Sequence, residues 1–264
     1  MNYTWNWGIF LEPSPEGAGT YADMLLSGLA WTVVTALCSW AIAFTLGSVV
    51  GVMRTLPSRT ANAIGAAYVE GFRNVPLLVQ MFLWYFVLPE LLPARLSSAV
   101  KQMPDAPFYT AVLCLGFFTA ARVAEQVRAG IRALPRGQAQ AGLALGLTWA
   151  QTYRAVLLPN AYRIILPPLT SEFLNNLKNT SVALTIGLLE LTARARSMQE
   201  FSFQVFEAFT AATLLYVALN LVVIAGATLG IVDDPYRPYG SLHVVPAESS
   251  THLSGHFETS GGHF

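Results

Sequence analysis

The sequence predicts an all-α integral membrane protein with five transmembrane helices. Of its 264 residues, 54% are hydrophobic and only 11% are charged, whereas soluble domains carry about 25% charged residues. The first apolar run, Met24–Met53, contains no charged residue, and a helix needs roughly 20 apolar residues to cross a bilayer. Further long apolar segments follow along the chain. The bilayer is therefore the expected solvent for most of the molecule.

The first span is expected to be permanent and not a cleaved signal, because residues 1–23 contain no Lys or Arg and a signal peptide begins with basic residues. Residues 1–23 are then an external segment, and residues 24–232 form the transmembrane domain. The expected spans are Met24–Met53, Ala67–Leu88, Ala106–Ala124, Ile164–Leu189 and Ala208–Val232.

Basic residues predict the orientation, because Lys and Arg are enriched on the cytoplasmic side. With the N-terminus outside and the C-terminus in the cytoplasm, ten arginines lie inside: Arg54, Arg59, Arg73, Arg122, Arg128, Arg132, Arg136, Arg154, Arg163 and Arg237. Four basic residues lie outside: Arg95, Lys101, Arg194 and Arg196. Lys178 falls within a span.

The longest cytoplasmic loop, 122–163, is expected to contain two short helices at an angle. Gln138–Leu145 is rich in helix formers, and Gly146 stands where a C-terminal glycine adopts the left-handed conformation. Thr148 and Gln151 have the spacing of a capping box for the second helix, which Pro159 is expected to end. A partner protein is the expected cover for this apolar pair; packing under its own helices, or an amphipathic interfacial segment, is the alternative.

The same loop resembles the "EAA" loop of ABC-importer permease subunits. That pattern is Glu-Ala-Ala, three residues, Gly, nine residues, Ile, any residue, Leu-Pro. Here Gln140-Ala141-Gly142 is followed at the same spacing by Gly146 and by Val156-Leu157-Leu158-Pro159. Gln140 stands for the usual Glu and Gly142 for the second Ala. The segments 70–86 and 154–183 resemble the polar amino acid branch, most of all its glutamate/aspartate permease subunits.

The resemblance implies a type-I ABC importer permease fold in the bacterial inner membrane. The residues it assigns to coupling with an ATPase are Gln140, Ala141, Gly142, Gly146, Leu158 and Pro159. It also implies two ATPase subunits that bind ATP and Mg, a second similar permease, an external solute-binding protein and a polar amino acid substrate, most specifically glutamate or aspartate.

No catalytic or cofactor site is expected in this chain. A phosphate-binding loop needs a Lys after a Gly, and neither of the two lysines, Lys101 and Lys178, follows a Gly. All four histidines lie beyond residue 240 in a spacing that fits no zinc pattern, so no metal site is predicted. No basic tract indicates nucleic acid.

A polar stripe runs along the fourth predicted span. Glu172, Asn175, Asn176 and Asn179 follow the i, i+3, i+4, i+7 pattern of one helix face, with Lys178 on its flank. Ionisable groups within spans are costly and usually functional. The stripe is a candidate substrate path for an amino acid; the alternative is interhelical hydrogen bonding at a permease–permease interface.

Pro76 is expected to kink the second span, with Arg73 and Gln80 about one turn away on either side. These three residues are candidates for gating, beside the alternative of a plain structural kink. Residues 233–264 have the composition of a disordered tail. Two other functions stay open at this point: an ion-coupled secondary amino acid transporter and a non-transporting membrane scaffold.

Overall fold

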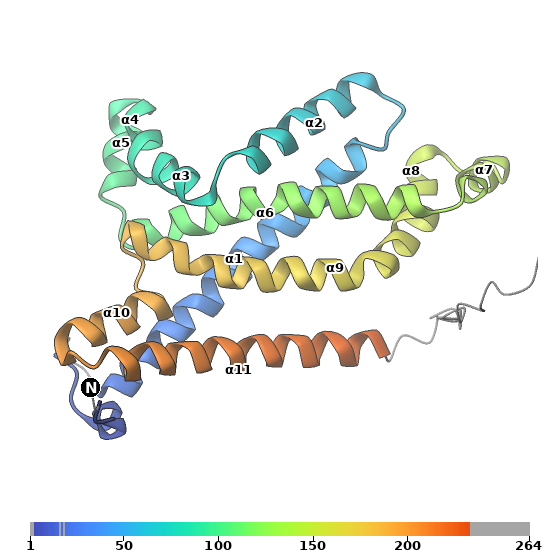
Figure 1. Cartoon of the computed structure of the whole chain (residues 1–264). Helices are drawn as coiled ribbons and strands as arrows, with labels where there is room; N and C mark the ends of the chain where they lie inside the picture. Colours follow the sequence, from blue (N-terminus) through green and yellow to red (C-terminus); the bar gives the residue numbers. More distant parts are fainter. Residues whose placement is uncertain (1–2, 16, 18, 233–264) are drawn as a thin grey trace, which may run out of the picture.

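The computed structural model describes residues 3–15, 17 and 19–232, so the predicted disorder of 233–264 lies outside the described part. Four long helices dominate it: α1 (Tyr21–Met53), α6 (Ala106–Ala133), α9 (Leu158–Asn179) and α11 (Val205–Val232). Figure 1 shows α6, α9 and α11 lying alongside one another, with α1 crossing them obliquely. Shorter helices gather at the two ends of these four.

A capping box formed by Thr20 and Asp23 sets the start of α1. The Thr20 hydroxyl accepts a hydrogen bond from the backbone N–H of Asp23 at 3.3 Å, and the Asp23 carboxylate accepts one from the N–H of Thr20 at 2.9 Å. This capping box satisfies two free amide groups at the helix start. The helix therefore starts at Tyr21, three residues before the expected boundary.

Two glycines allow α1 to pack closely against α6. A Cβ on Gly47 would lie 2.6 Å from the Cβ of Val123, and a Cβ on Gly51 would lie 2.7 Å from the Cβ of Val127. Both distances are too short for real carbon atoms. The four-residue spacing of small residues is typical of close helix pairs in membranes. Close backbone approach at Gly47 and Gly51 therefore sets the α1–α6 contact.

The helix predicted over Ala67–Leu88 is interrupted at Pro76, where a kink was expected, and the interruption is a complete break. The structure has α2 (Arg59–Asn74), an extended break at Val75 and Pro76, and then α3 (Leu77–Phe82), a π turn η2 (Leu83–Val87) and α4 (Leu88–Leu91). The two halves are bent by 101°. The cause is local, because a proline pushes the preceding residue out of the helical region, and Val75 has a ψ of 129°.

The third predicted span ends too early at Ala124. Helix α6 continues without interruption to Ala133. Glu125, Arg128 and Arg132 are good helix formers, and no proline occurs in the chain between Ala124 and Pro135. About two and a half further turns thus extend the span toward the loop that follows. They carry Glu125 and Arg128 next to the end of α1.

The prediction that Pro159 ends the second loop helix is also wrong. Helix α8 (Trp149–Thr152) passes through a π turn, η3 (Tyr153–Leu157), directly into α9. A proline clashes with the preceding turn of a regular helix, and the wider π turn relieves that clash. The side-chain amide of Asn160 then donates to the carbonyl of Val156 at 2.8 Å.

Helix α9 ends ten residues before the predicted boundary at Leu189. It stops at Asn179, and a tight 3-10 segment η4 (Thr180–Ile186) and the left-handed Gly187 follow. Three helices in the described part are long and apolar enough to span a bilayer: Tyr21–Met53, Ala106–Ala133 and Val205–Leu229; the bent pair makes a fourth if it counts as one crossing. A crossing by α9, which contains two prolines and the polar stripe, stays a prediction.

Candidate functional site

The loop helix α7 (Arg136–Ala144) ends as the sequence predicts. Gly146 has a φ of +81°, the left-handed conformation that a glycine adopts without a Cβ penalty. The N–H of Leu147 donates to the carbonyl of Gly142 at 3.1 Å, and the N–H of Gly146 donates to Leu143 at 3.0 Å. These two bonds form a Schellman motif. The turn thereby sets the angle between α7 and α8.

The second loop helix is capped as expected and packs against the first. The hydroxyl of Thr148 accepts from the N–H of Gln151 at 3.3 Å, and the Gln151 side chain accepts from the N–H of Thr148 at 2.8 Å. A Cβ on Gly142 would lie 2.9 Å from the Cγ2 of Thr152. Gly142 is therefore a packing residue within the pair, and its place in the EAA-like pattern has a structural reason.

The outer side of the helix pair is exposed, whereas its inner side is not. Gln140, Ala141 and Gly146 are exposed, and the side chain of Leu145 is 82% exposed. Trp149 is 47% exposed, but Tyr153 and Leu157, which follow it at helical spacing, are buried in the chain's own core with α6. The first turn of the second loop helix is therefore open, and its later turns anchor the loop. Leu158 is half-buried and Pro159 is exposed.

The loop is joined to α1 through one tyrosine. The hydroxyl of Tyr153 lies 3.1 Å from the backbone carbonyl oxygen of Thr55 and 3.1 Å from the Thr55 hydroxyl. Tyr153 also belongs to the same core cluster as Val127 and Ile131 of α6. Tyr153 therefore joins the loop both to the end of α1 and to α6.

One member of the polar stripe lies inside the helix bundle. Asn176 is fully buried, and all its polar atoms are used. Its amide nitrogen donates to the carbonyl of Ala36 at 3.0 Å and to the hydroxyl of Ser39 at 2.9 Å, and its oxygen accepts from Thr119 at 3.1 Å. Asn176 thus connects α9 with α1 and α6 within this chain, and its amide is not open to a substrate here.

The other members of the stripe are more accessible. Glu172, Asn175 and Asn179 are half-buried, and Lys178 is exposed. One carboxylate oxygen of Glu172 is buried without a hydrogen-bond partner in the described chain.

The three candidate gating residues have different environments. Pro76 lies at the break between α2 and α3, and Gln80 is buried. The Gln80 amide nitrogen donates to the carbonyls of Phe72 at 2.8 Å and Val75 at 2.9 Å, which are the unpaired carbonyls at the end of α2. Gln80 therefore stabilises the break, whereas Arg73 is exposed and free to change its partner.

Sequence reasoning missed an ion-pair cluster centred on Glu125. Its carboxylate pairs with Arg54 at the end of α1, with Arg128 at 2.6 Å, and with Arg73 at 3.8 Å. The i, i+3 spacing of Glu125 and Arg128 was the only signal in the sequence. The contacts with Arg54 and Arg73 depend on tertiary structure. The cluster links α1, α2 and α6 at one end of the bundle.

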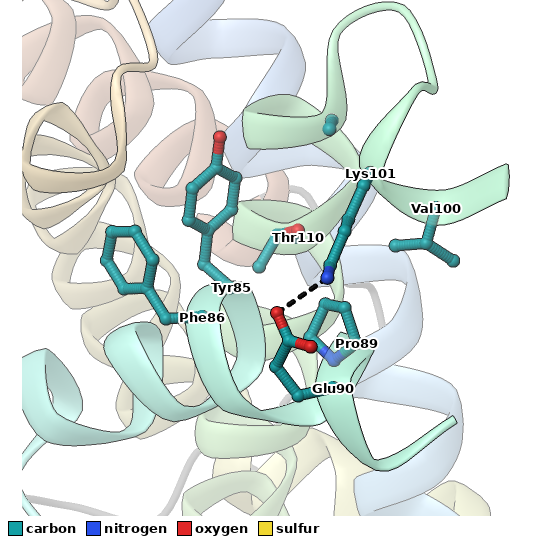
Figure 2. A pocket seen from close by; sticks show the side chains of 8 residues that line it. Tyr85, Phe86, Pro89, Glu90, Val100, Lys101 and Thr110 are labelled. Atoms are coloured by element: carbon teal, nitrogen blue, oxygen red, sulfur yellow. Dashed lines mark hydrogen bonds and ion pairs between the residues drawn. The ribbon is translucent and has the colours of Figure 1, made fainter. Parts of the chain in front are cut away.

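A small pocket of about 190 Å³ lies where α4, α5 (Ala94–Lys101) and α6 meet. Figure 2 shows the Lys101 ammonium pointing toward the Glu90 carboxylate, at 2.5 Å, with Tyr85 and Thr110 nearby. Both charged side chains are exposed, and exposed pairs contribute about 0–1 kcal/mol. Because the two charges cancel, the pocket has no net preference for an ion.

Among the described residues, no group of three or more His, Cys, Asp or Glu side chains is arranged to hold a metal ion. The four histidines considered in the sequence lie outside these residues.

Comparison with known proteins matches residues 25–229 to the family described as "Binding-protein-dependent transport system inner membrane component". The chain is 50% identical over 245 residues to the glutamate/aspartate import permease protein GltJ of Escherichia coli K12, covering 92% of this chain and 99% of that protein. It is 30% identical over 200 residues to the glutamine transport system permease protein GlnP of the same organism, covering 76% and 88%.

Solved structures show the same architecture. A crystal structure of an amino acid ABC transporter with histidines superposes with a TM-score of 0.69 and 29% identity, covering 80% of this chain and 94% of that one. An inward-facing structure of the MetNI methionine ABC transporter, 18% identical, superposes with a TM-score of 0.65 over 80% of this chain and 95% of that one, which shows the shared fold.

Proposed function

Because the chain belongs to the family of binding-protein-dependent transport system inner membrane components, we propose that it admits acidic amino acids, glutamate and aspartate, to the cell. Family membership makes the chain the non-enzymatic permease subunit of an ABC importer in the inner membrane, with a separate ATPase subunit. This decides against the ion-coupled and scaffold alternatives. The observation that carries the substrate proposal is the 50% identity with GltJ over 92% of the chain.

The proposed assembly contains two ATPase subunits that bind ATP and Mg, a second similar permease and an external solute-binding protein. The exposed side of α7 and the turn that follows it form the proposed docking surface for an ATPase subunit. It consists of Gln140, Ala141, Leu145 and Gly146, all exposed. Gly142 supports this surface because it packs against Thr152, and Leu158 and Pro159 lie at the start of α9, where the loop ends.

The proposed orientation places the loop in the cytoplasm and the N-terminus outside. It is supported by the basic residues that gather around Glu125 and the loop, because Lys and Arg are enriched on the cytoplasmic side. The Lys101–Glu90 pair and helix α10 (Leu191–Ser202) then lie at the external end.

The proposed substrate path follows the accessible part of the polar stripe: Glu172, Asn175, Lys178 and Asn179. Lys178 supplies the positive charge that an acidic substrate needs, and the asparagine amides donate to carboxylates. Glu172 accepts the ammonium group of the amino acid. Arg73 is the proposed gating residue because it is exposed at the end of α2 and its pair with Glu125 of α6 is long, at 3.8 Å.

The test is uptake by the purified complex in proteoliposomes, with the external binding protein and internal ATP supplied. Labelled glutamate, aspartate, glutamine and arginine are compared at equal concentration. We expect ATP-dependent uptake of glutamate and aspartate well above glutamine and arginine. Uptake of glutamine or arginine alone would overturn the substrate assignment while leaving the permease assignment intact.

A further inference from the structure

A basic pocket of about 570 Å³ lies beside the coupling loop. It is formed where the end of α1, the start of α2, the end of α6, the start of α7 and the segment α8–η3 meet. Its lining residues are Arg54, Thr55, Asn62, Arg132, Arg136 and Trp149, over a floor that includes Tyr153 and Leu157.

The pocket has an excess of positive charge. Arg132 and Arg136 are exposed, and neither has an acidic partner within the described residues. Arg54 pairs with Glu125, but the same carboxylate also pairs with Arg128 at 2.6 Å, so one negative charge faces two arginines. No Asp or Glu occurs between Glu125 and Glu172, a stretch that contains five arginines. The start of α7 adds to the positive potential, since helix N-termini attract anions.

The pocket lies just beyond the ends of two candidate spans. Arg54 and Thr55 directly follow α1, which ends at Met53, and Arg132 lies in the last turn of α6. In the proposed orientation both helix ends face the cytoplasm, so the inner leaflet is the nearest source of anionic headgroups. Trp149 at the rim is exposed, and tryptophan is enriched at membrane–water interfaces.

We infer that this pocket binds the phosphate headgroup of an anionic phospholipid from the inner leaflet. Arg132 and Arg136 hold the phosphate oxygens, and the Trp149 ring covers the adjoining glycerol and acyl carbons. Basic pockets between helices on the cytoplasmic side recognise anionic headgroups in this way. Because the Tyr153 hydroxyl joins the pocket floor to Thr55, a bound lipid stabilises one position of the coupling loop relative to α1.

The inference rests on the proposed orientation, but it is independent of the transported solute. Two other occupants share the chemistry: free inorganic phosphate, and an acidic side chain of the ATPase subunit. The experiment therefore measures lipid binding directly, and its failure leaves the uptake assay of the proposed function untouched.

The test is native mass spectrometry of the full complex in mild detergent. Phosphatidylglycerol and phosphatidylcholine with the same acyl chains serve as probes. The variant Arg132→Gln/Arg136→Gln is compared with Arg59→Gln/Arg154→Gln, which removes the same charge from exposed cytoplasmic arginines outside the pocket. We expect wild type to prefer phosphatidylglycerol, and the pocket variant to lose about tenfold or more in its affinity, at about 1 kcal/mol per arginine.

The control variant should retain its affinity within about threefold, because distant exposed charges are screened. Equal losses in the two variants, or equal binding of both lipids, would overturn the inference. Competition by inorganic phosphate at matched concentration would assign the site to free phosphate instead. Loss of the ATPase subunit with unchanged lipid binding would assign it to that contact. If the double variant does not purify, Arg136→Gln alone should still weaken binding about fivefold.

Discussion

The hydroxyl of Tyr153 in the loop is 3.1 Å from the carbonyl oxygen of Thr55 at the end of α1. This hydrogen bond joins two segments 98 residues apart in the sequence. It connects the proposed ATPase-docking surface to the first transmembrane helix. Because Tyr153 is otherwise buried against α6, its ring and its hydroxyl act on different helices.

Removal of that hydroxyl should weaken coupling more than it weakens the fold. Tyr153→Phe keeps the ring packing and costs about 1 kcal/mol of stability. We expect uptake per ATP hydrolysed to fall severalfold, measured in proteoliposomes. Tyr162→Phe is the matched control, since it removes a hydrogen bond of Tyr162 to Ser48 that also joins α9 to α1. Equal uptake per ATP in both variants would contradict the coupling role of Tyr153.

Gly146→Asp should separate the permease from its ATPase. Gly146 has a φ of +81°, so any side chain there is strained by roughly 1 kcal/mol or more, and the Asp adds a charge to the docking surface. We expect normal membrane insertion but loss of ATPase co-purification. Gly137→Asp adds the same charge to the first turn of α7, where nothing lies within 4 Å of its Cβ, and should retain the ATPase. Association of the Gly146→Asp chain with the ATPase would refute the assignment.

Two substitutions in the polar stripe should affect different properties: Asn176→Ala should lower stability, and Glu172→Gln should slow uptake. Asn176→Ala leaves buried groups of Ala36, Ser39 and Thr119 without their partner, which costs about 1–3 kcal/mol. We expect a lower melting temperature in detergent. Glu172→Gln should slow uptake several-fold without changing the melting temperature or the assembly. Loss of assembly in Glu172→Gln, with normal uptake per remaining complex, would favour an interface role for Glu172.

Glu190 caps α10 from a fully buried position. Its carboxylate accepts from the N–H groups of Thr192 and Ala193 and from the hydroxyl of Tyr216. A buried donor that loses its acceptor costs about 1–3 kcal/mol, so these bonds are expected to stabilise the fold.

Glu190→Ala should therefore lower the melting temperature in detergent, because it removes the acceptor of all three bonds. Asp23→Ala is the control, since it removes an exposed cap of α1 and should lower the melting temperature less. An equal or smaller loss in Glu190→Ala would contradict the stabilising role of Glu190.

Local chemistry was predictable from the sequence. The left-handed Gly146, the capping box of Thr148 and Gln151, and the uncharged span that ends at Met53 all depend on residues within a few turns of each other. Each has a single strong physical cause: a missing Cβ, a pair of side-chain oxygens, or thirty residues without a charge in a bilayer. For the same reason, the two loop helices and the turn between them were predictable without a structure.

The sequence by itself therefore determined the membrane class, the turn between the loop helices α7 and α8, and the polar face of α9. Only the tertiary structure decided which polar groups meet. The Asn176 amide donates to the carbonyl of Ala36, which is 140 residues away in the sequence. Glu125 pairs with Arg54, which is 71 residues away. Gln80 turns back to the carbonyls that the break at Pro76 leaves unpaired. A buried polar group must be satisfied by whatever lies beside it, and in a helix bundle that neighbour is set by packing and not by sequence distance.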